Sequence, residues 1–125
     1  MKNNNRQIKN HAFDLEDRTL DFAKRIIRMC KTLSSNVVNF KLIDQLIRSA
    51  GSIGANYREA NDALSKKDFL MRMKIARKEA KETEYWLNLV IEANMDLKEK
   101  IVPLVRESIE LKKILSAIIT KSSNK

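Results

Sequence analysis

The sequence has few of the residues on which many common folds and sites depend. One cysteine, one histidine, two glycines and one proline occur in 125 residues, and 6% of the residues are aromatic. So little glycine and proline excludes a turn-rich β-sandwich or barrel and argues against disorder. A lone cysteine cannot form an internal disulfide, so we expect a cytoplasmic protein. Cys30 itself lies on an apolar helix face and is expected in the core.

The shortage of histidine limits the chemistry that the chain can perform. His11, in the polar N-terminal segment, is the only one, so a zinc site of Cys and His and a histidine-activated nucleophile are both excluded. A di-iron bundle needs histidines on its helices and is excluded for the same reason. The two glycines, Gly51 and Gly54, cannot form a glycine-rich phosphate loop. We therefore expect no catalytic residues, no metal, no cofactor and a protein that is not an enzyme.

Long apolar runs are also missing. No segment approaches the ~20 apolar residues of a membrane-spanning helix. The basic segment that precedes Phe13 lacks the apolar stretch of a signal peptide. We expect no association with a membrane.

What the sequence does contain is helical periodicity. Apolar residues recur at three- and four-residue spacing, which is typical of one buried helix face, in four segments: 14–33, 41–61, 66–94 and 101–120. Ser65 is expected to cap the third segment, and Pro103 to lie in the first turn of the fourth. Val37, Val38 and Phe40 are expected to form an apolar connection packed against the bundle end. Four such helices predict an all-α fold, an antiparallel up-down-up-down four-helix bundle.

Charge divides the chain into three parts. Lys and Arg total 25 against 16 Asp and Glu, for a net charge of +9, and five of the basic residues lie in segments 1–13 and 121–125, which contain no acidic residue. We expect a basic flexible leader (1–13), the helical bundle (14–120) and a disordered basic tail (121–125). Excess positive charge favours nucleic acid as a partner, and a lysine-rich coat that only confers solubility is the alternative.

A line of polar residues accompanies the apolar stripe of the second segment. These residues follow one another at spacings of three, four and three, and the third segment offers charged partners. Together they predict a structural polar network between two helices: Ser49, Ser52, Asn56, Glu59, Arg77, Glu79 and Glu82. The alternative is a carboxylate site for acid–base chemistry or a metal. Gly51 and Gly54 are expected to allow another helix to approach closely, since glycine otherwise weakens a helix.

The third segment carries a basic side and an additional apolar side. The candidate nucleic-acid-binding residues are Lys66, Lys67, Arg72, Lys74, Lys78 and Lys81. The candidate oligomer interface consists of Met71, Ile75, Tyr85 and Trp86, because apolar area outside the main stripe is typical of an interface. For the aromatic pair, a second core face and stacking on nucleic-acid bases are the alternatives.

One family shares these motifs. The pattern begins at Gln45-Leu46, Arg48-Ser49-Ala50, Ser52-Ile53, Asn56 and Glu59-Ala60, and continues through 65–69, 75–87 and 114–119. It resembles the bacterial four-helix-bundle proteins encoded in intervening sequences of large-subunit ribosomal RNA, often labelled ribosomal-protein-like. The resemblance extends from Phe13 to Thr120. It implies a bundle that assembles as a homopentamer around a channel. The fold is also similar to that of the accessory protein of diversity-generating retroelements, a basic pentamer that binds a reverse transcriptase and nucleic acid.

Together these observations lead to one hypothesis and a rival. The chain is expected to be a non-enzymatic, homopentameric scaffold that binds RNA or DNA through its basic surface. The alternative is a protein-interaction adaptor with no nucleic-acid role.

Overall fold

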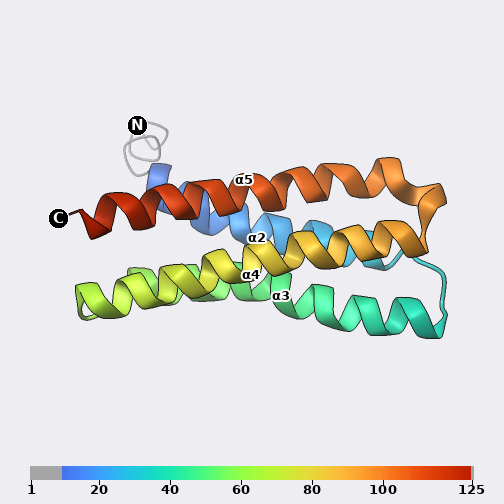
Figure 1. Cartoon of the computed structure of the whole chain (residues 1–125), viewed down its shortest axis with the longest axis horizontal. Coiled ribbons are helices and arrows are strands. Elements are labelled where there is room, and N and C mark those ends of the chain that lie inside the picture. Colours follow the sequence, from blue (N-terminus) through green and yellow to red (C-terminus); the bar gives the residue numbers. More distant parts are fainter. Residues whose placement is uncertain (1–9, 125) are drawn as a thin grey trace, which may run out of the picture.

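The computed structural model describes residues 10–124, and the side chains of residues 15–124. Four long helices, α2 (Asn10–Cys30), α3 (Val37–Asn61), α4 (Lys66–Ala93) and α5 (Lys98–Ser123), and the short 3-10 helix η1 (Met95–Leu97) make up this part of the chain, which contains no strand. Successive helices run in opposite directions, so that α3 packs between α2 and α4, and α5 returns beside α4 and α2 (Figure 1). The predicted all-α fold with antiparallel neighbours is confirmed.

The helices extend beyond the predicted bounds. α2 begins at Asn10, within the predicted leader, and α5 runs from Lys98 to Ser123, into the predicted basic tail. Pro103 consequently lies inside α5 rather than in its first turn. The added turns of α5, residues 98–100 and 121–123, are mostly exposed and carry no apolar stripe, so periodicity could not reveal them. The rest of the predicted leader, residues 1–9, lies outside the described residues.

The start of α3 differs from the prediction. Asn36 caps this helix, since its Oδ1 accepts a hydrogen bond from the Asn39 backbone N–H at 2.8 Å. Val37, Val38 and Phe40 therefore lie in the first turn of α3, and they are 67%, 53% and 61% exposed. The expected apolar connection packed against the bundle end is wrong, because a capping Asn was interpreted as part of a loop. Ser65 caps α4 as predicted, accepting from the Asp68 N–H at 3.1 Å.

The core follows the predicted apolar stripes. All four long helices contribute fully buried side chains, the largest of which include Phe22, Ile26, Leu46, Ile53, Met73, Leu87, Leu111 and Leu115. Cys30 is buried, as predicted, and burial raises the pKa of its thiol to about 11. A bidentate pair, in which Arg18 donates to Glu107 at 2.7 and 2.9 Å, connects α2 to α5 at the edge of this core.

The two glycines of α3 have different surroundings. A Cβ at Gly54 would lie 2.8 Å from Thr19 Oγ1 of α2, whereas a Cβ at Gly51 would meet no atom within 4 Å. The close approach of another helix is therefore confirmed at Gly54 and wrong at Gly51. Residues three apart point about 60° from each other around a helix, and this offset places Gly54 against α2 while Gly51 stays on the outside.

Candidate functional site

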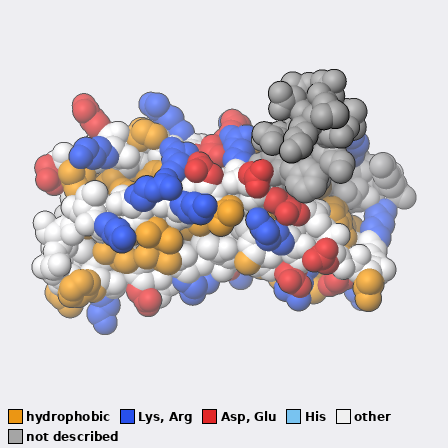
Figure 2. Space-filling view, turned by 180° about the vertical axis from the view of Figure 1, so that it is seen from behind, with side chains coloured by type: hydrophobic (Ala, Val, Ile, Leu, Met, Phe, Trp, Pro, Cys, Tyr) orange, Lys and Arg blue, Asp and Glu red, His pale blue; other side chains and the backbone are white. Residues whose placement is uncertain are grey.

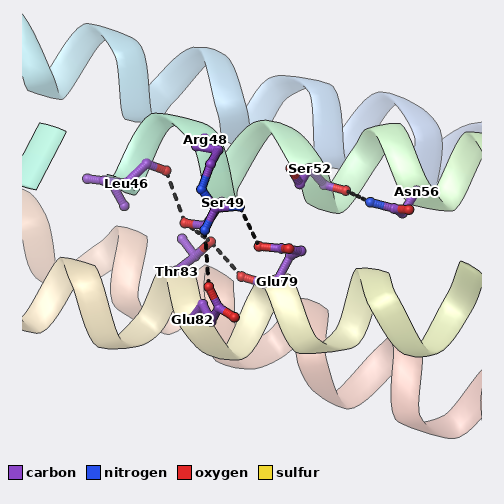
Figure 3. Close-up of polar contacts among 8 residues, drawn as sticks. All are labelled: Leu46, Arg48, Ser49, Ser52, Asn56, Glu79, Glu82 and Thr83. Atoms are coloured by element: carbon purple, nitrogen blue, oxygen red, sulfur yellow. Dashed lines mark hydrogen bonds and ion pairs between the residues drawn. The ribbon is translucent and has the colours of Figure 1, made fainter. Parts of the chain in front are cut away.

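The predicted polar network has its centre where α3 crosses α4. The hydroxyls of Ser49 and Thr83, both fully buried, lie 2.9 Å apart and form a hydrogen bond between the two helices (Figure 3). Ser49 also donates to the Leu46 carbonyl at 3.1 Å, and the Thr83 hydroxyl lies 2.7 Å from the Glu79 carbonyl oxygen. Both hydroxyls thus have partners without water, as buried polar groups require.

Arg48 of α3 supplies the positive charge of this network. Its guanidinium lies 3.6 Å from Glu79 Oε1 and donates to Glu82 Oε1 at 3.2 Å (Figure 3). Glu79 is buried and its Oε1 accepts no hydrogen bond, so the Arg48 charge compensates this carboxylate across a contact slightly longer than a hydrogen bond. Two carboxylates beside one guanidinium form an ion-pair cluster, and such clusters hold helices in register.

The other predicted members lie away from this cluster. Asn56 donates to the Ser52 carbonyl of its own helix at 2.9 Å, and its Oδ1 lies 3.5 Å from Arg72 Nη1 (Figure 3 shows the first contact). Glu59 is exposed, and among the described side chains neither Glu59 nor Arg77 shares a hydrogen bond or ion pair with the network. The structure thus brings together Ser49, Glu79 and Glu82 and leaves the predicted line incomplete.

Arg48 and Thr83 were missing from the predicted set. Thr83 belongs to the apolar stripe of α4, where a hydroxyl needs a partner, and that requirement was the available signal. Arg48 stands next to Ser49 in the sequence, and its role depends on where α4 lies, which sequence alone does not show.

A second buried polar pair was also missed. Asn39 of α3 and Asn94, which follows α4, exchange two hydrogen bonds of 2.9 and 3.1 Å through their side-chain amides. Each amide also donates to a backbone carbonyl, that of Ser34 or that of Val90, at 2.8 and 2.9 Å. The pair fastens the α2–α3 connection to the end of α4. It is a structural contact, since both residues are buried.

Within the part of the chain that the structure describes, no group of three or more His, Cys, Asp or Glu side chains is placed to hold a metal ion. None of the helices formed by residues 10–124 is long and apolar enough to cross a membrane.

The predicted basic residues separate into three groups. Lys66 and Lys67 are exposed at the start of α4, where Lys66 borders a hollow beside the α3–α4 turn. Arg72 is half-buried and turns towards α3. Lys74, Lys78 and Lys81 are exposed, and together with Arg77 and Lys112 they line one hollow of about 420 Å³ between α4 and α5. Of the described cavities, this one has the most Lys and Arg side chains in its lining.

The four residues of the predicted oligomer interface differ in their exposure. Met71 and Tyr85 are exposed by 48% and 60%, whereas Ile75 and Trp86 are half-buried, Trp86 against the core of its own chain. The Tyr85 and Trp86 rings meet edge to face, with centroids 5.3 Å apart and planes at 76°.

Further exposed apolar side chains lie on α2 and α3, where none had been predicted. Leu20 and Ile27 of α2, and Phe40 and Ile47 of α3, are exposed by 37% to 61%. Figure 2, which views the molecule from behind Figure 1, shows hydrophobic side chains gathered near the end away from the grey segment, with Lys and Arg between them. We call Leu20, Ile27, Phe40 and Ile47 together the α2/α3 apolar surface.

Four antiparallel amphipathic helices, internal polar contacts and a lysine-rich outer side define a small helical-bundle protein. The chain belongs to the 23S rRNA-intervening sequence protein family, whose model matches residues 12–117, so the resemblance found in the sequence is confirmed. It is similar to the crystal structure of a protein of unknown function of the S23 ribosomal protein family from Bacteroides thetaiotaomicron. That match has 40% sequence identity and a TM-score of 0.79, and covers 87% of this chain and 97% of the other. No curated protein matches the chain.

Proposed function

We propose that this protein is a non-enzymatic homo-oligomeric scaffold of the cytoplasm, with five copies as the family resemblance implies, that binds nucleic acid through basic surface. The observation that carries the nucleic-acid role is the convergence of Lys74, Arg77, Lys78, Lys81 and Lys112 on one hollow between α4 and α5. Scattered surface lysines only increase solubility, whereas several cations lining one hollow provide a site for a polyanion. The family description, which names 23S rRNA, makes RNA the first nucleic acid to test.

Exposed apolar residues support the oligomer. The α2/α3 apolar surface and Met71 leave large apolar side chains in contact with water, and identical chains commonly cover such surfaces by closing into a ring. Tyr85, first expected in the interface, lines a hollow together with Lys81 and Lys112, and we assign it to the nucleic-acid surface instead. The same apolar surface also suits a different protein, so an adaptor without a nucleic-acid role is the second candidate.

Light scattering at micromolar concentration tests the assembly. The expected mass is five times the 14.5 kDa of one chain. Phe40→Glu, on the α2/α3 apolar surface, should lower that mass, because a charge cannot be buried unpaired. Leu64→Glu is the matched control, since Leu64 is fully exposed in the α3–α4 turn. Both variants should keep the helical circular dichroism. A wild-type monomer would remove the ring from the proposal.

Salt dependence separates the scaffold from the adaptor. If about five phosphates are contacted, the affinity for a labelled single-stranded RNA should fall about 100-fold between about 50 and about 200 mM salt. An absence of RNA binding at low salt would leave the adaptor as the better account.

A further inference from the structure

We propose that the hollow between α4 and α5 is a groove for single-stranded nucleic acid, in which lysines hold the phosphates and Tyr85 stacks on a base. This inference rests on the nucleic-acid role proposed above and specifies its site and its ligand. Two adjoining hollows between α4 and α5 support this inference. The first is lined by Lys74, Arg77, Lys78, Lys81 and Lys112, and the second by Lys81, Glu84, Tyr85, Asn88 and Lys112. Because they share Lys81 and Lys112, they form one continuous groove.

The groove is strongly and almost uniformly positive. Its five cations face a single carboxylate, that of Glu84, which lies 3.7 Å from Lys112 Nζ. Among the described side chains, Lys74, Lys78 and Lys81 take part in no ion pair. Uncompensated like charges in one groove repel one another, and a bound row of phosphates would relieve that repulsion. The elongated array suits a chain of phosphates better than a single ion.

The spacing of the lysines fits a short run of nucleotides. Lys74, Lys78 and Lys81 follow one side of α4 over seven residues, which is about 10 Å at 1.5 Å per residue. A stacked strand advances about 3.4 Å per nucleotide, so about three phosphates can lie beside this row. Lys112, from α5, forms the opposite wall.

Tyr85 distinguishes a single strand from a duplex. It borders the far end of the groove and is 60% exposed, while its edge-to-face contact with the half-buried Trp86 orients its ring. An exposed aromatic ring beside a row of cations is the arrangement that binds unpaired bases by stacking. The bases of a duplex are already stacked on one another and offer no face to Tyr85. Asn88, on the next turn, lines the same end and can hydrogen-bond a base edge.

Fluorescence anisotropy of the full chain tests the groove. The probes are a labelled RNA of about 12 nucleotides without secondary structure and the duplex of the same sequence. The charge variant is Lys78→Glu/Lys81→Glu, and its matched control is Lys66→Glu/Lys67→Glu, which changes the net charge equally outside the groove and places acids in the first turn of α4, where they are tolerated. Circular dichroism verifies the fold of each variant.

The groove variant should lose at least tenfold more affinity for the single strand than the control, and its salt dependence should be shallower. Tyr85→Ala should weaken single-strand binding about 5- to 100-fold, leave duplex binding unchanged, and be rescued by Tyr85→Phe, which keeps the ring. Equal losses in the two charge variants would overturn the groove. Tighter duplex binding, or an unaffected Tyr85→Ala, would overturn the single-strand assignment. A wild-type chain that binds neither probe would refute the proposed function itself, and the groove with it.

Discussion

Gly54→Ala tests the close contact between α3 and α2. The added Cβ would lie 2.8 Å from Thr19 Oγ1 and 3.1 Å from Thr19 Cβ. Thr19 cannot move away freely, because it is buried and its hydroxyl lies 2.9 Å from the Leu15 carbonyl oxygen in a hydrogen bond of the same helix. To admit the methyl group, the Thr19 side chain must rotate away from that bond or α2 must shift.

The size of the effect follows from two opposing terms. Alanine is favoured over glycine in a helix interior by about 1 kcal/mol, whereas overpacking a tight contact costs about 1–3 kcal/mol. Gly54→Ala should therefore range from neutral to about 2 kcal/mol destabilising. Gly51→Ala has the same propensity gain and nothing within 4 Å, so it should stabilise by about 1 kcal/mol. The difference in unfolding free energy between Gly51→Ala and Gly54→Ala therefore measures the cost of overpacking at Gly54.

Thermal unfolding followed by circular dichroism measures this difference. For a chain of this length, 1 kcal/mol corresponds to about 4 °C in Tm, and all variants must be compared at one protein concentration, because the Tm of an oligomer depends on it. In a Thr19→Ala background the nearest atom is gone, so Gly54→Ala should cost less there. The reasoning would be refuted if Gly54→Ala stabilised as much as Gly51→Ala, or if its cost were the same in both backgrounds.

Two further predictions concern buried polar groups. Asn39→Ala or Asn94→Ala leaves the other amide short of a partner and should destabilise by about 1–3 kcal/mol. The double variant should cost less than the sum in urea unfolding, and additive costs would mean that the pair is not coupled. Burial raises the pKa of Cys30 from 9.0 to about 11. Between pH 9 and about pH 11 the folded chain therefore keeps a thiol proton that the unfolded chain releases, and the free energy of unfolding should fall as the pH rises through this range. Cys30→Ala should show a smaller fall over that range, and identical pH profiles would contradict this.

Helix type and core membership could be predicted because they depend on a local period. Residues such as Phe22, Leu46 and Leu111 repeat at helical spacing, and all are fully buried. Helix ends depend instead on single capping contacts and on turns that face solvent. The Asn36 cap sets the start of α3 at Val37. The apolar side chains of that first turn, Val37, Val38 and Phe40, are exposed, so they continue no buried stripe that would mark the helix there.

The polar contacts could be predicted only in part, since each needs two helices at a known separation and rotation. Ser49 was identified from its spacing beside the stripe, but its partner Thr83 lies on the apolar stripe of α4 and was missing from the predicted network. Asn39 and Asn94 lie 55 residues apart, next to helix ends. Nothing in a single sequence indicates that two such distant residues meet.

The basic groove shows why the site needs the structure. Arg77 and Glu79 were expected to face α3 together, yet two residues turn a helix by about 200°. Glu79 meets Arg48 of α3, and Arg77 lines the groove towards α5. Periodicity gives the angle between two side chains of α4, but the placement of α3 and α5 around α4 depends on how the whole bundle closes. Lys112, 31 positions beyond Lys81 in the sequence, joins the predicted lysines for that reason. The candidate ligand site therefore arises from the packing of α5 against α4.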